Sequence, residues 1–198
     1  MVDALPLRIF QASPGDLRDE REVVRACVDE YNTRRRGGSN VTYEVVGWER
    51  VRGTARRPQE AINELIAESH FLVALFKKSW GSEPGSPWGY TSGTEEELFT
   101  GLLELGRAEQ PMRDVWVAFL DHPSPADQIV NLRQQMSRRH SMMYESIADI
   151  RELKESWPNA SKPGRRRQDP RSSNTSTCCR RPGRTSSAQR TSASWARS

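Results

Sequence analysis

The sequence has 198 residues, of which 35% are hydrophobic and 28% are charged, and it carries a formal net charge of +4. Its longest apolar run, Phe71–Phe76, is far shorter than the roughly 20 residues of a membrane-spanning helix, and its three cysteines cannot form a framework of paired disulfides. Because Met1–Pro6 also lacks the basic and apolar segments of a secretory signal, we expect a cytoplasmic protein that makes no membrane contact.

The first part of the chain predicts two strands joined by a long helix. The apolar segment Leu7–Ala12 indicates the first strand, and a Ser-Pro-Gly turn begins at Ser13. Asp16 is a good N-cap for a helix that runs to about Arg35, where cations in the last turn precede glycine. Branched and aromatic residues in Val41–Gly47 indicate the second strand.

The middle of the chain continues the alternation. Pro58 stands where the first residue of a helix would, and Ala61–Ile66 supply the apolar face of that helix. The continuous apolar run Phe71–Phe76 indicates a third strand, buried on both faces. A loop rich in Gly, Ser and Trp follows in Lys77–Gly93, and helical periodicity covers Glu95–Arg107.

The last ordered part predicts two more strands and two more helices. A fourth strand spans Val115–Leu120 and a helix spans Asp127–Arg139. A weak fifth strand lies near Ser141–Tyr144, and a final helix spans Ser146–Glu155.

The remaining residues differ sharply in composition. Ten of the 30 basic residues but only one of the 26 acidic residues lie in 156–198, which therefore carry a charge of +9, against −5 for residues 1–155. Residues 156–198 contain no Leu, Ile, Val, Phe or Met, so they cannot bury enough apolar surface to offset the entropy of ordering. We predict a domain in residues 1–155 and a disordered, basic Ser/Arg/Pro-rich tail in residues 156–198.

Three interpretations of the tail stay open. The abrupt change of amino-acid composition after Glu155 is typical of a GC-rich gene read out of frame, so the tail can be a frameshift product. Alternatively, Arg165–Arg167 and Arg180–Arg181 contact phosphates in a nucleic-acid-binding arm, or the tail is an ordinary linker. Nucleic-acid binding is expected only through this segment.

Strands separated by helices predict right-handed crossovers and a parallel sheet covered on both faces. The expected fold is therefore α/β, a flavodoxin-like three-layer sandwich with a five-stranded parallel sheet in the order 2-1-3-4-5. In such sheets ligands bind beyond the carboxyl ends of the strands, at the switch point beside strands 1 and 3. This places a site among Ser13–Asp16, Trp48–Arg52 and the loop Lys77–Glu97.

Most familiar catalytic and metal signatures are missing from the sequence. It has no Walker loop, no G-x-G-x-x-G, no H-E-x-x-H and no paired C-x-x-C. The histidines His70, His122 and His140 are scattered along the chain. We therefore predict no metal ion and no resident cofactor.

Glu97 has two interpretations. Thr94 with Glu97 fits the capping box S/T-x-x-E at the start of a helix, which gives Glu97 a structural role. Alternatively, Glu97 faces a bound nucleoside or dinucleotide, and its carboxylate stabilises or traps an oxocarbenium-like centre as an N-glycosidic bond breaks.

The other candidate site residues also have two interpretations each. The turn and helix N-terminus at Ser13 and Asp16 suit a phosphate, although Asp16 also serves as an N-cap. The aromatic segments Trp80-Gly81 and Trp88–Tyr90 can stack on a base, or they can pin the long loop and form a partner surface. Arg50 can bind phosphate or lie in a solvated loop. The candidate ligand-binding residues are Ser13, Asp16, Trp48, Arg50, Trp80, Gly81 and Thr94.

Four segments form an ordered set of motifs. S-x-x-D-L-x-x-E-R occurs in Ser13–Arg21, and the apolar strand Phe71–Phe76 is followed by Trp80, Gly81 and then G-T-x-x-E in Gly93–Glu97. The set covers residues 6–155 and resembles a TIR-like domain of unknown function that commonly stands at the N-terminus of bacterial STAND/NACHT-type NTPases. The resemblance implies a TIR-like version of the fold and a role in signalling or defence.

The resemblance extends to TIR domains that cleave NAD and to nucleoside 2-deoxyribosyltransferases, which carry a glutamate on the helix after strand 3. Glu97 matches that position, so the resemblance implies binding or cleavage of NAD-like nucleotides there, with NAD as a substrate and not a cofactor. It also implies self-association or assembly with a downstream or neighbouring signalling NTPase. Two alternatives stay open: a free-standing NAD or nucleoside N-glycosidase or deoxyribosyltransferase-like enzyme that uses Glu97, and an interaction domain in which Glu97 only caps its helix.

Overall fold

The computed structural model describes residues 6–35, 41–53, 56–139 and 142–157. Within these residues the chain forms an α/β fold around a five-stranded sheet in the order β2-β1-β3-β4-β5. All four strand pairs are parallel. The predicted fold class and strand order are confirmed, while the predicted tail lies outside the described residues from residue 158 onward.

The boundaries of the elements follow the predicted alternation. The strands are β1 (Leu7–Ala12), β2 (Tyr43–Val46), β3 (Phe71–Phe76), β4 (Asp114–Leu120) and β5 (Glu145–Ile147). The helices are α1 (Arg18–Arg35), α2 (Pro58–Ala67), α3 (Gly93–Leu105), α4 (Asp127–Arg139) and α5 (Ile150–Ser156), with a 3-10 turn at Trp48–Arg50. No helix of the described part is long and apolar enough to cross a membrane.

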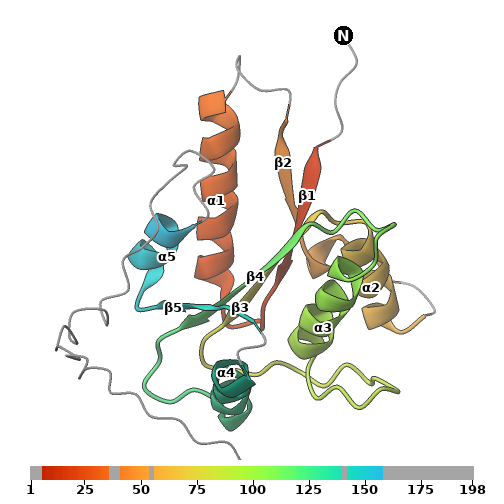
Figure 1. Cartoon of the computed structure of the whole chain (residues 1–198), viewed down its shortest axis with the longest axis vertical. Helices are drawn as coiled ribbons and strands as arrows, with labels where there is room; N and C mark the ends of the chain where they lie inside the picture. Colours follow the sequence, from red (N-terminus) through yellow and green to blue (C-terminus); the bar gives the residue numbers. More distant parts are fainter. Residues whose placement is uncertain (1–5, 36–40, 54–55, 140–141, 158–198) are drawn as a thin grey trace, which may run out of the picture. The chain divides into compact units, whose positions relative to one another are not determined.

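The helices cover both faces of the sheet (Figure 1). On one face α1 and α5 pack against alternate strand residues such as Ile9, Val73 and Leu75. On the other, α2, α3 and α4 bury the intervening residues, which include Phe10 and Leu72. The alternation arises because successive strand residues point to opposite faces, and it gives the sheet two apolar cores.

The predicted positions of β5 and α5 are wrong by several residues. The short strand β5 pairs residues 145–147 with Ala118–Leu120, whereas Tyr144, predicted to lie in the strand, stacks edge-on against Phe119. The final helix begins at Ile150 and not at Ser146, because the carboxylate of Asp149 accepts the backbone N–H of residue 152 and caps the helix.

The packed part extends beyond Glu155. Trp157 lies edge-on against Trp116 of β4, with ring centroids 5.7 Å apart, and it packs against the core beneath α1 and α5. Composition alone assigned Trp157 to the tail, but its ring belongs to the domain.

Candidate functional site

A pocket of about 740 Å³ opens beyond the carboxyl ends of β1 and β3, at the predicted switch point. Its walls come from the β1–α1 turn, the 3-10 turn, the start of α2, the β3–α3 loop and the first turn of α3. This volume lies within the usual range for small-molecule sites. The predicted residues that line it are Ser13, Asp16, Trp48, Trp80, Gly81, Thr94 and Glu97.

Glu97 lies at the buried side of this pocket. The residue is only 4% exposed, and its carboxyl oxygen Oε2 has no hydrogen-bond partner among the described residues. Burial raises the pKa of Glu97 well above its ordinary value of 4.5, and the charges of Glu49 and Glu96 raise it further against a smaller opposing effect of Arg21. The carboxyl group therefore keeps its proton to a much higher pH than a surface glutamate.

The cap of α3 does not use Glu97, so the predicted capping box of Thr94 and Glu97 is wrong. The N-cap is Ser92, whose hydroxyl accepts the backbone N–H of Glu95 at 3.0 Å. The carboxylate of Glu95 in turn accepts the backbone N–H of Thr91 at 2.7 Å. Because this earlier pair satisfies the helix start, Glu97 is left without a capping role.

Glu96, the immediate neighbour of Glu97, has the opposite environment. Its side chain is 1% exposed and accepts two hydrogen bonds from Arg57, at 2.9 and 2.8 Å, and one from Asn63 at 2.9 Å. Burial alone would raise the pKa of Glu96, but the hydrogen bonds from Arg57 and Asn63 outweigh it and lower the pKa. Glu96 is therefore a charged structural anchor, whereas Glu97 is an unpaired acid.

The sequence predicted Asp16 as the N-cap of α1, and this prediction is wrong. The helix begins at Arg18, and the carboxylate of Asp16 accepts the backbone N–H of Ser79 at 3.1 Å. The two residues come from different loops, so this bond ties the β1–α1 turn to the β3–α3 loop at the pocket.

The β3–α3 loop is shaped by Gly81 and Trp80. Gly81 has φ of +103°, which residues with a side chain rarely adopt, and a Cβ there would lie 3.4 Å from that of Ser92. Trp80 is buried, and its indole N–H donates to the hydroxyl of Thr91 at 2.8 Å. Trp48, which also lines the pocket, is 44% exposed, so its ring is accessible to a ligand.

Arg50 is the one predicted ligand-binding residue that lies elsewhere. Its guanidinium pairs with Glu44, and it lines a separate pocket of about 350 Å³ beside β2. The predicted contact of Arg50 with a phosphate in the main pocket is therefore not supported by its position.

Arg21 and Glu49 belong to the surroundings of the site, although sequence reasoning assigned neither a site role. Arg21 donates to the hydroxyl of Ser13 at 3.3 Å and to the carbonyl of Pro14 at 3.2 Å, and its Nε lies 3.6 Å from Glu49. The sequence did contain a signal for Arg21, because it lies on the apolar face of α1, four residues after Leu17. A charged residue there requires polar partners.

The pocket lining has an acidic character. Among its described residues are Asp16, Glu83 and Glu97, and none is Lys, Arg or His. No group of three or more His, Cys, Asp or Glu side chains in the described part could hold a metal ion. The lining therefore favours a neutral or cationic portion of a ligand over a phosphate.

No protein-family model matches the chain, and the search of curated proteins gives no match. The resemblance to TIR-like domains therefore stays a prediction.

Proposed function

We propose that the domain binds an NAD-like nucleotide and cleaves the N-glycosidic bond to its positively charged base. The observation that carries this proposal is Glu97, a buried acid beside a ligand-sized pocket, with an unpaired oxygen and no part in the helix cap. Buried carboxyl groups with strongly perturbed pKa values in a pocket are typical of functional sites. The acidic lining and the exposed indole ring of Trp48 suit a flat cationic ring.

The reaction can be written with the residues present. Within the described part of the chain, Glu97 has no ion-pair partner that would stabilise its carboxylate. A pyridinium ring that enters the pocket supplies such a charge, so the pKa of Glu97 falls and its proton is released. The resulting carboxylate stabilises the positive charge that develops on the ribose as the bond from its anomeric carbon to the ring nitrogen breaks. Both electrons of that bond leave with nicotinamide, and water adds to the ribose and gives up a proton. Glu97 regains its own proton when the products leave. The products are nicotinamide, ADP-ribose and one proton.

The test compares Glu97→Gln with Glu104→Gln in the full chain. Both glutamates lie on α3, both are buried, and both have one unpaired carboxyl oxygen, but Glu104 is absent from the pocket lining. We expect nicotinamide release from NAD, measured by mass spectrometry, to fall about 100-fold or more in Glu97→Gln and to change little in Glu104→Gln. Equal turnover by the two variants would contradict the proposal.

Ligand charge provides a second prediction. NAD should bind more tightly as the pH rises through the raised pKa of Glu97, because binding of a cation then no longer has to displace a proton. NADH, whose dihydropyridine ring is neutral, should show no such increase. Calorimetry in two buffers of different ionisation enthalpy measures the released proton directly. Glu97→Gln should abolish both the release and the pH dependence, and a release that persists in this variant would assign the proton to another group.

We also propose that the domain self-associates as a signalling module. Trp88 supports this, because its side chain is 79% exposed in the β3–α3 loop, and exposed aromatic residues are enriched at protein interfaces. Replacing Trp88 by Ser should shift the association equilibrium toward the monomer in sedimentation experiments. The matched control is Met143→Ser, which removes an apolar side chain that is 93% exposed on a different segment.

A further inference from the structure

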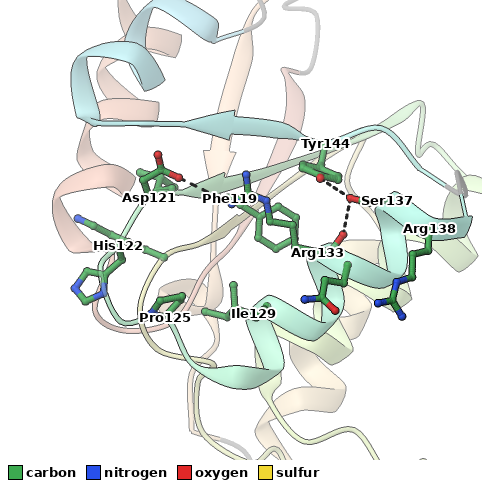
Figure 2. Close-up of a pocket in the computed structure, with 13 residues that line it drawn as sticks. Phe119, Asp121, His122, Pro125, Ile129, Arg133, Ser137, Arg138 and Tyr144 are labelled. Carbon is green, nitrogen blue, oxygen red and sulfur yellow. Dashed lines mark hydrogen bonds and ion pairs between the residues drawn. The ribbon is translucent and has the colours of Figure 1, made fainter.

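A second pocket, of about 430 Å³, lies at the carboxyl end of β4 and beside α4 (Figure 2). Its lining shares no residue with that of the first pocket. The apolar part of the lining combines Phe119, Leu120 and Ile129, each at most 5% exposed, with the more accessible Pro125 and Val130. A backbone hydrogen bond from Ala126 to the carbonyl of Lys78 joins the β4–α4 and β3–α3 loops.

The charge of this pocket is opposite to that of the first. Its described lining includes the basic residues Lys77, Arg133 and Arg138, and Asp121 is its only acidic residue. Lys77 is already paired, because its ammonium group lies 2.6 Å from a carboxylate oxygen of Glu20. The two arginines therefore carry the unbalanced charge.

Arg133 is held in place mainly by aromatic rings and a hydroxyl group. Its guanidinium carbon lies 6.0 Å from the ring centroid of Phe119 and 5.8 Å from that of Tyr144, and one nitrogen donates to Ser146 at 2.8 Å. Its ion pair with Asp121 is long, at 3.9 Å, and the Asp121 side chain is 64% exposed. In Figure 2 the guanidinium lies beside the Phe119 ring. A guanidinium oriented in this way keeps N–H donors for a bidentate anion.

Two further residues show that the positive charge is poorly compensated. The side chain of Arg138 forms no ion pair or hydrogen bond with another residue of the described part. The pKa of Tyr144 is lowered by a hydrogen bond with Ser137, and the charge and hydrogen bond of Arg133 lower it further against the effect of burial. The part of this shift that comes from Arg133 reflects the positive charge beside the phenol ring.

We propose that this pocket binds a small organic anion with a flat apolar body. The body lies against Pro125 and Val130, which are more exposed than Phe119 and Ile129, and the anionic group, a carboxylate or a phosphate, contacts Arg133 and Arg138. Burying an apolar ring on this surface and pairing two arginines that lack a close carboxylate are both favourable. The site is independent of Glu97 and of the proposed cleavage reaction.

The test uses 2-naphthoate and its neutral isostere 2-naphthamide, titrated into the full chain and followed by calorimetry. We expect the carboxylate to bind at least roughly tenfold more tightly than the amide, because hydrogen bonds between a guanidinium and a carboxylate are stronger than those to a neutral amide. The titration is repeated with 2-naphthyl phosphate and with inorganic phosphate. Comparing 2-naphthyl phosphate with 2-naphthoate identifies which anionic group the pocket prefers. Inorganic phosphate should bind far more weakly than either because it lacks the apolar body. Equal binding of carboxylate and amide would overturn the proposal.

Arg138→Gln is the diagnostic variant, because Arg138 is exposed and lacks partners whose loss would unfold the chain. It should weaken 2-naphthoate binding by roughly fivefold or more. The matched control is Arg139→Gln, which removes the neighbouring charge of the same helix from a residue outside the pocket lining. Equal effects of the two variants would show that only general charge matters and would reject the site. Glu97→Gln should leave 2-naphthoate affinity unchanged.

Discussion

Replacing Glu96 by Ala is expected to lower the free energy of unfolding by about 3–5 kcal/mol, because it leaves a largely buried guanidinium without its partner. The side chains of Arg57 and Glu96 are 18% and 1% exposed, and Asn63 also loses an acceptor. The same arginine donates to the carbonyl of Pro84 at 3.3 Å. The change therefore weakens the contact between α2 and α3 and the anchoring of the pocket loop.

Urea unfolding of Glu96→Ala and Glu60→Ala provides the measurement. Glu60 lies 3.9 Å from the same arginine, but its side chain is 54% exposed, so its loss should cost less than about 1 kcal/mol. Folding lowers the pKa of Glu96. Its contribution to the free energy of unfolding is therefore complete above the pKa that Glu96 has in the unfolded chain, and it is lost as the pH falls through the pKa in the folded chain. Similar costs for the two variants would show that the ion pair of Glu96 is weak.

Glu97→Gln is expected to stabilise the domain, and increasingly so as the pH rises. The folded pKa of Glu97 lies well above 4.5, so between the unfolded and folded pKa values the folded chain binds more protons than the unfolded chain. Stability therefore falls with rising pH in that window, by up to about 1.4 kcal/mol per pH unit from this one group. Glutamine has nearly the shape of the protonated acid and avoids this loss.

Thermal unfolding of the wild type and Glu97→Gln between pH 4 and pH 8 tests the expectation. The melting temperatures should nearly coincide at the acidic end and diverge toward pH 8, with the variant higher. Glu104→Gln again provides the buried control on the same helix. A difference that is constant with pH would mean that Glu97 titrates as it does in the unfolded chain.

Much of the fold could be predicted because it depends on patterns that the sequence carries locally. The apolar runs of β1, β3 and β4 and the helical periods between them require crossovers, and right-handed crossovers restrict the order of a parallel sheet. The short edge strand β5 was misplaced because Met142, Met143 and Tyr144 have a strand-like composition. The buried residue that fixes β5 is Ile147.

The location of the pocket was predictable, but the partners of the polar side chains around it were not. Asp16 and Thr94 both fit local capping rules, yet Asp16 bonds to a distant loop and Ser92 caps α3 instead. Arg50 pairs with Glu44, a residue of the neighbouring strand. Such choices depend on which groups the tertiary structure brings within reach, and spacing in the sequence does not contain that information.

Capping α3 and facing the pocket were two roles that the sequence offered to Glu97, and the structure gives them to different residues. Ser92 and Glu95 cap the start of the helix, and Glu96 joins it to α2 through Asn63. Glu97 takes part in neither of these contacts. A lineage could therefore exchange the acid at position 97 in a single mutational step and keep an intact, even more robust, domain. If the proposed cleavage depends on Glu97, a catalytic and a purely structural version of this chain differ by one codon.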